Sequence, residues 1–146
     1  MPDSPPPGFP PAADSATIER LQEAARKAAA NAYAPYSHFL VGAALLFDDG
    51  FIATGCNIEN VSYGLTICAE RSALSTAISE RGADHKIVAI AVTNLNSAAS
   101  PPCGGCRQVL SEFVTSDAVV SFPGDKGLEL RPFSEIFPFT FHLEPR

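Results

Sequence analysis

The chain has 146 residues, a formal net charge of −6 at neutral pH and a hydrophobic content of 46%. This length favours one domain with a substantial core. The acidic charge argues against a nucleic-acid partner, and the lack of a run of about 18 apolar residues argues against a membrane span. We therefore expect a globular protein that acts on a small molecule.

The first 14 residues are rich in proline and precede the first periodic pattern. Because proline lacks a backbone donor and blocks a helix, the sequence predicts a disordered tail at 1–14 and a single domain at 15–146. From Ser15 to about Ala32, apolar residues recur at helical spacing among charged residues, which predicts an amphipathic helix. These apolar positions are Ile18, Leu21, Ala25, Ala28 and Ala29.

Two extended, apolar-rich runs follow at 39–47 and 51–58, and the turn residues Asp48-Asp49-Gly50 join them. Such a pair predicts an antiparallel hairpin. A second helix is expected over 66–81, with Thr66 as its N-cap.

The nearly continuous apolar run at 86–93 predicts a buried central strand. A third helix is expected from Cys103 to about Val114, and two short strands at 118–122 and 128–131. Strands that alternate with helices predict an α/β domain with a mixed sheet.

Three cysteines stand at the spacing of a zinc site. Cys68 lies in Thr66-Ile67-Cys68-Ala69-Glu70-Arg71, and Cys103 and Cys106 lie in Pro102-Cys103-Gly104-Gly105-Cys106-Arg107. A closed structural site uses four protein ligands, so three cysteines leave one tetrahedral position of a zinc ion open for water or substrate. All three are expected in the first turns of helices, where the positive dipole end stabilises thiolates. Buried thiols or a redox Cys-x-x-Cys pair would be the alternative.

Glu70 lies two residues after the first proposed zinc ligand, and we predict that it carries protons in catalysis. Cys-x-Glu followed by Pro-Cys-x-x-Cys matches the signature of zinc-dependent nucleobase deaminases, whose glutamate acts as general acid and base without binding the metal. This element argues against the redox alternative. Arg71 and Arg107 are predicted to donate to the sulfurs and offset the charge of three thiolates. Cys56 is expected to be a packed core thiol.

Four segments closely resemble the small homotetrameric cytidine deaminases. They are Phe39-Leu40-Val41-Gly42-Ala43-Ala44-Leu45, Gly55-Cys56-Asn57-Ile58-Glu59-Asn60, Cys68-Ala69-Glu70-Arg71 and Pro102-Cys103-Gly104-Gly105-Cys106-Arg107-Gln108. The likeness covers roughly residues 18–142. It implies a three-layer α/β/α sandwich with about five strands, and a homotetramer with shared active sites. It also implies zinc-dependent hydrolysis of cytidine and deoxycytidine to uridine and deoxyuridine, with release of ammonia, in pyrimidine salvage.

The resemblance assigns substrate contacts as well. It implies that Asn57 and Glu59 bind the ribose hydroxyls, that Phe39 packs beside the nucleoside, and that Ala69 belongs to the binding site. By periodicity alone, Asn57 and Glu59 alternate along a strand and fit an exposed polar face equally well.

Two further residues are implied to act across a subunit interface. Tyr63 matches a position that reaches the substrate from a neighbouring subunit, and Phe141 matches a C-terminal aromatic that stacks on the pyrimidine. The family usually reads Leu-Leu-Pro-x-x-Phe-Gly in this region, whereas this chain reads Ile136-Phe137-Pro138-Phe139-Thr140-Phe141-His142. Phe139 and Phe137 therefore compete with Phe141 for this role.

Two rival classes of function stay open from the residues alone. A module that uses zinc only for folding predicts a fourth protein ligand and leaves Glu70 unexplained. A deaminase of another cytosine compound, or of a base within nucleic acid, would share the zinc core. Only ten Lys and Arg residues are present, which favours a free nucleoside. No apolar signal-peptide stretch follows Met1, so we expect reduced thiols and a cytoplasmic protein.

Overall fold

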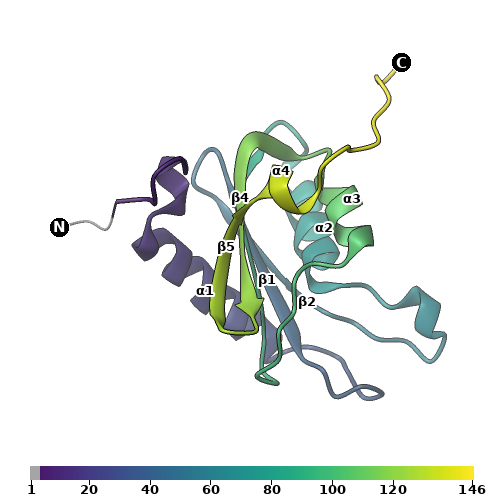
Figure 1. Ribbon diagram of the computed structural model, residues 1–146. Coiled ribbons are helices and arrows are strands. Elements are labelled where there is room, and N and C mark those ends of the chain that lie inside the picture. The colour runs from purple at the N-terminus through teal and green to yellow at the C-terminus, as the bar shows by residue number, and fades with distance from the viewer. Residues whose placement is uncertain (1–3) are drawn as a thin grey trace.

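The computed structural model describes residues 4–146 and contains a five-stranded mixed sheet with the strand order β2-β1-β3-β4-β5 (Figure 1). The strands are β1 (Val41–Phe47), β2 (Ile52–Cys56), β3 (Ile87–Asn94), β4 (Val114–Gly124) and β5 (Gly127–Pro132). β1 pairs antiparallel with β2 and β3, β4 pairs antiparallel with β5, and β3 and β4 run parallel. The mixed sheet expected from the sequence is confirmed.

Helices cover both faces of this sheet. They are α1 (Ser15–Ala29), α2 (Ala69–Arg81), α3 (Gly104–Leu110) and α4 (Phe133–Ile136), with short 3-10 helices η1 (Pro11–Ala13) and η2 (Tyr63–Leu65). Helix α1 lies on one face, and α2 and α3 lie on the other (Figure 1). This arrangement confirms the three-layer α/β/α architecture. Among residues 4–146, no helix combines the length and apolarity that crossing a bilayer requires.

The core consists of two apolar clusters, one on each face of the sheet. On the α1 face, Leu21 packs with Ala44 and Val119, and on the α2 face, Leu74 packs with Leu45. Because both faces are covered, neighbouring residues of β1 are buried on opposite sides, which explains why this strand is almost continuously apolar.

Two glycines allow helices to approach the sheet closely. A Cβ atom at Gly55 of β2 would lie 2.7 Å from the Ala69 carbonyl oxygen and would clash with the Ala73 nitrogen of α2. A Cβ atom at Gly42 of β1 would clash in the same way with the Ala25 carbonyl of α1. The first turn of α2 therefore sits directly against the β2 backbone.

The first helix ends three residues earlier than the sequence predicts. The N–H groups of Asn31 and Ala32 donate to the carbonyls of Ala28 and Ala29 at 3.0 and 3.1 Å, which closes the helix with a tighter turn. The chain then leaves the helix, and the Tyr33 N–H donates to the Asn57 carbonyl at 3.0 Å.

The second helix begins at Ala69, so the prediction of Thr66 as its N-cap is wrong. Ile67 is held extended because its N–H and C=O both bond to Ile58, at 3.0 and 2.9 Å. Cys68 is the N-cap instead. The third helix is also shorter than predicted, since it ends at Leu110 and the chain re-enters the sheet at Val114. The four-residue α4 was not predicted.

The proline-rich segment is partly packed where the sequence predicts a disordered tail. Pro11–Ala13 form η1, Ala13 is buried, and Phe9 contacts the apolar cluster on the α1 face. Apolar contacts of Phe9 and Ala13 hold this part of the segment against the α1 face. Pro2 lies outside the described residues. The division into a tail at 1–14 and one domain at 15–146 stays a prediction.

We expect Gly55→Ala to lower the free energy of unfolding by about 2 kcal/mol, because the added methyl group must displace the first turn of α2 from β2. Urea denaturation measures this change. Gly104→Ala is the matched control, since a Cβ there meets nothing within 4 Å. Equal stability of the two variants would contradict the close approach.

Candidate metal centre and active site

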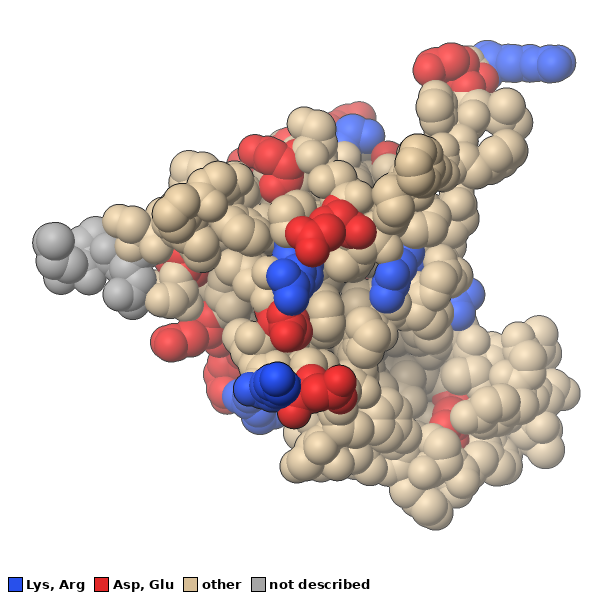
Figure 2. Space-filling model, viewed as in Figure 1, with Lys and Arg blue, Asp and Glu red and all other residues tan. Residues whose placement is uncertain are grey.

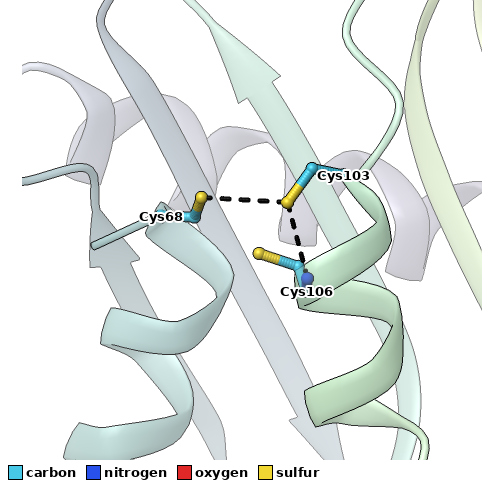
Figure 3. Close-up of side chains that lie close together, drawn as sticks. All are labelled: Cys68, Cys103 and Cys106. Atoms are coloured by element: carbon cyan, nitrogen blue, oxygen red, sulfur yellow. Dashed lines mark hydrogen bonds between the residues drawn. The ribbon is translucent and has the colours of Figure 1, made fainter. Parts of the chain in front are cut away.

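Three cysteine sulfurs converge where α2 and α3 begin (Figure 3). Cys68 is the N-cap of α2, Cys103 is the N-cap of α3, and Cys106 lies in the first turn of α3. Their Sγ atoms all lie within 4.8 Å of one another, and those of Cys68 and Cys103 are 3.9 Å apart. Cys106 is fully buried, whereas Cys103 is exposed. The sequence prediction that these three residues meet is confirmed.

The fold brings these sulfurs together because α2 and α3 pack side by side on the same face of the sheet. Their N-terminal ends offer free N–H groups, and the Cys106 N–H donates to Cys103 Sγ at 3.4 Å. A hydrogen bond from the Cys106 thiol and the nearby Arg71 guanidinium lower the pKa of Cys68 to about 5, although burial opposes this. The same hydrogen bond and burial raise the pKa of Cys106. A thiolate is therefore already favoured at Cys68.

The donor set fits zinc. A tetrahedral site with Zn–S bonds of about 2.3 Å separates its sulfurs by about 3.8 Å, and the Cys68–Cys103 distance of 3.9 Å agrees with this value. Among residues 4–146, no histidine, carboxylate or fourth cysteine joins the group. Three ligands leave one position of a tetrahedral zinc ion open. The fourth protein ligand that a purely structural zinc module requires is not found among residues 4–146.

The two arginines next to the cysteines have different contacts. Arg71 Nη2 donates to Cys68 Sγ at 3.5 Å, and this thiolate raises the pKa of Arg71. Arg107 does not take the predicted position: its Nε donates to the Pro102 carbonyl at 2.7 Å and its Nη1 to the Ile136 carbonyl at 2.6 Å. Neither carbonyl belongs to a β-strand. Both accept hydrogen bonds from the guanidinium of Arg107, which is thereby directed away from the sulfurs. The prediction that Arg107 donates to a sulfur is therefore wrong.

A cavity of about 260 Å³ opens beside the sulfurs. It is lined by Cys68, Cys103 and the predicted residues Phe39, Asn57, Glu59, Tyr63, Ala69 and Glu70. Glu70 lies in the first turn of α2 and is only 3% exposed. Burial raises the pKa of its carboxyl group. A titratable group with a raised pKa in a cavity beside a metal centre is suited to proton transfer.

Asn57 and Glu59 are buried and line the cavity, although β2 ends before them at Cys56. Asn57 Oδ1 accepts from the Val41 N–H at 2.9 Å, and its Nδ2 donates to the Phe39 carbonyl at 2.8 Å. Neither residue forms the exposed polar face that strand periodicity alone allows. Instead, Asn57 holds the backbone next to Phe39.

Glu59 accepts hydrogen bonds from a loop that precedes β1. Its Oε1 accepts from the N–H groups of Tyr36 and Ser37 at 3.0 and 3.2 Å, and its Oε2 accepts from the Ser37 hydroxyl and from Tyr63 Oη. The Ser37 hydroxyl is the main reason that the pKa of Glu59 lies below its ordinary value. Ser37 also lines the cavity. No motif in the sequence indicated this residue.

The C-terminal aromatic residues lie outside this cavity. Phe141 is 69% exposed, and its carbonyl accepts from Gln108 Nε2 at 3.5 Å. Phe139 is fully exposed, whereas Phe137 packs against Phe133 with ring centroids 6.1 Å apart. Phe137 is thus used in packing, and Phe141 and Phe139 stay free for contacts with another molecule. Tyr63 lines the cavity of its own chain. The resemblance implies instead that this residue reaches the cavity of a neighbouring subunit.

Residues 15–122 match the sequence model of the family described as "Cytidine and deoxycytidylate deaminase zinc-binding region". The chain is 46% identical over 127 residues to the cytidine deaminase of Halalkalibacterium halodurans, a match that covers 86% of this chain and 95% of that protein. It is 43% identical over 124 residues to the cytidine deaminase of Mycobacterium tuberculosis, with 85% and 89% of the two chains covered.

The structure also resembles solved structures of cytidine deaminases. The crystal structure of cytidine deaminase from Mycobacterium tuberculosis superposes with a TM-score of 0.75 at 42% identity, covering 86% of this chain and 97% of that one. The cytidine deaminase from Burkholderia pseudomallei superposes with a TM-score of 0.77 at 40% identity, covering 84% and 98%.

We expect Ser37→Ala to raise the pKa of Glu59 toward its ordinary value of 4.5, because the strongest hydrogen bond to the carboxylate is lost. A lowered pKa means that the ionised group stabilises the fold above pH 4.5, and that this contribution is lost as pH falls through the lower folded value. In the variant, the contribution should shrink. NMR titration of the Glu59 carboxyl carbon measures the shift, and Ser75→Ala, at an exposed position of α2, is the control. An unchanged pKa would contradict the assignment.

Proposed function

The chain belongs to the cytidine and deoxycytidylate deaminase family, and from this premise we propose that it hydrolyses cytidine and deoxycytidine to uridine and deoxyuridine with release of ammonia. The observation that carries the proposal is the position of Glu70, buried in the cavity beside three sulfurs that leave a metal position open. Bound zinc supplies a Lewis acid that makes water a nucleophile at neutral pH, and Cys68, Cys103 and Cys106 would hold it.

Glu70 would move the protons of this reaction. Its carboxylate takes a proton from the attacking water and delivers it to N3 of the cytosine ring. It then takes the remaining proton of the new hydroxyl at C4 and passes it to the amino group, which leaves C4 as ammonia. Burial raises the pKa of this carboxyl, so its protonated form is more accessible than that of an exposed glutamate. One group can therefore serve as both base and acid.

The remaining lining residues would bind and orient the nucleoside. Phe39 offers an aromatic surface to the base, and the carboxylate of Glu59 together with the amide of Asn57 would bind ribose hydroxyls. Ala69 is the first residue of α2, so its N–H lacks a partner within the helix and can donate to a carbonyl of the substrate. Arg71 would stabilise the Cys68 thiolate, as its contact with the sulfur supports.

We also propose a homotetramer with shared active sites. A lobe next to the cavity exposes large apolar side chains from two segments, and Figure 2 shows few charged residues on the visible face of this region. These side chains are Tyr33, Tyr36, Ile58, Val61, Tyr63, Leu65 and Ile67. An apolar area of this kind favours a protein interface. Phe141, exposed at the chain end, would reach a neighbouring cavity, and a contact of Tyr63 across the interface stays a prediction.

A role in pyrimidine salvage and a cytoplasmic location complete the proposal. The four cysteines are free in the structure, which supports a reducing compartment. The acidic net charge of −6 supports a free nucleoside over DNA or RNA as substrate, and no membrane is needed for it.

Glu70→Gln should lower kcat/KM for cytidine by at least about 10²-fold, because the amide cannot accept or return a proton. Zinc content and thermal stability should stay close to those of the wild type. The loss of ultraviolet absorbance as cytidine becomes uridine measures the rate. Glu112→Gln, at an exposed position, is the control and should keep full activity. A Glu70 variant at wild-type rate would refute the proton-transfer role.

Light scattering should give a mass four times the 15.4 kDa of one chain. Leu65→Glu places a charge within the apolar lobe at a residue that is 70% exposed in one chain, so the assembly should dissociate and activity should fall while zinc is retained. Leu128→Glu, at an exposed leucine of β5, is the control. A wild-type monomer with full activity would contradict the shared sites.

A further inference from the structure

The loop that carries Phe39 is held in a strained backbone conformation. His38, directly before Phe39, has a backbone φ of +58°. Residues other than glycine rarely adopt this left-handed conformation. Such a conformation persists only where neighbouring groups hold it. The contacts of this loop therefore decide where the Phe39 ring lies in the cavity.

The backbone of Phe39 is bound on both sides by side chains of the site. Its N–H donates to Ser37 Oγ at 3.0 Å, and its carbonyl accepts from Asn57 Nδ2 at 2.8 Å. Ser37 in turn donates to Glu59. The proposed ribose ligands Asn57 and Glu59 are thus connected to Phe39 through hydrogen bonds.

Asn96 forms a second support from a distant part of the chain. Its Nδ2 donates to the His38 carbonyl at 2.9 Å, and its Oδ1 accepts from the Leu40 N–H at 3.0 Å. One amide thus binds the backbone on each side of Phe39. The orientation of the amide is dictated by its partners, since a carbonyl can only accept and an N–H can only donate.

Asn96 belongs to a loop that also forms part of the cavity wall. Asn94 organises this loop: its Oδ1 accepts from the N–H groups of Asn96 and Ala98 at 2.9 and 3.2 Å, and its Nδ2 donates to Ser100 Oγ at 2.8 Å. Ser100 and the next residue line the cavity, and the metal ligand Cys103 follows shortly after. The loop of Asn96 therefore connects the metal side of the cavity with the Phe39 side.

We propose that Asn96 is a positioning residue for the substrate, which acts by holding Phe39 against the nucleoside. The inference rests on the proposed function, and it adds a residue that none of the motifs in the sequence contains. Asn96 itself does not line the cavity. Its effect reaches the substrate through the two peptide groups that flank Phe39.

This role differs from a purely structural one in what it predicts. Asn96 is exposed, so its replacement opens no cavity in the core. Glu70 and Cys106 lie in the first turns of α2 and α3, and Cys68 and Cys103 are the N-caps of these helices. The hydrogen bonds of Asn96 go to Leu40, His38 and Asn94 and to none of these four residues. Loss of Asn96 should therefore weaken substrate binding and leave the metal content and the chemical step almost unchanged.

Asn96→Ala should raise KM for cytidine about tenfold, because both hydrogen bonds to the loop are lost, while kcat stays within about twofold. Asn96→Asp keeps the acceptor for the Leu40 N–H but places an oxygen against the His38 carbonyl, so its KM should rise at least as much. Asn31→Ala is the control, at an exposed asparagine for which no side-chain hydrogen bond is found among residues 4–146. Zinc content and thermal stability are measured for each variant.

A double-mutant cycle tests whether Asn96 acts through Phe39. In a Phe39→Ala background, Asn96→Ala should raise KM by less than about twofold, because the ring that Asn96 positions is gone. The same tenfold increase in both backgrounds would overturn the proposal. An unchanged KM for Asn96→Ala alone, or a fall in kcat with KM unchanged, would overturn it as well.

Hydrogen exchange separates this inference from the proposed function. The Leu40 amide should exchange about tenfold faster in Asn96→Ala than in the wild type, whatever the substrate is. If wild-type protein loaded with zinc does not turn over cytidine, the proposed function fails, and faster exchange of Leu40 still supports the positioning of the loop. Unchanged exchange at Leu40 would overturn the positioning role even if cytidine is the substrate.

Discussion

The close approach of α2 to β2 is the constraint on which the site depends. Gly55 lets the first turn of α2 lie directly against the strand, and α3 packs beside α2 on the same face. Two helix N-termini meet there, and three sulfurs come within 4.8 Å of one another. Because both ends are electropositive, thiolates are stabilised where the metal is to bind. The same turn of α2 carries Glu70 into the cavity.

The polar side chains of the cavity serve two purposes at once. Asn57 and Glu59 line the cavity, yet in this structure they also bond the backbone around Phe39. Asn96 holds the same backbone from the other side. The proposed ribose-binding side chains and the loop that carries Phe39 are thus coupled by hydrogen bonds. A change at one member of this network is expected to affect affinity more than chemistry, since Glu70 stands outside it.

Much of the fold followed from local patterns. Helical spacing of apolar residues predicted α1, and apolar runs bounded by turn residues predicted the hairpin of β1 and β2 and the central strand β3, because burial on a covered face requires apolar residues. Boundaries that depend on distant partners were missed. Ile67 pairs with Ile58, so α2 begins later than Thr66, and Val114 joins the sheet beside β3, so α3 ends earlier. The short α4 and the packing of Phe9 likewise rest on contacts with distant residues.

The sequence by itself determined the chemistry of the centre: three cysteines and Glu70 at fixed short spacings, which local geometry keeps at the starts of two helices. Only the tertiary structure decided which side chains surround this centre and which groups they bond. It directs Arg107 to two carbonyls instead of a sulfur, and it brings Asn96 to the loop of Phe39. The physical reason is that the spacing of ligands within one helix turn depends only on local geometry. The hydrogen-bond partners of a long side chain or of a loop amide depend on which groups folding brings close to it.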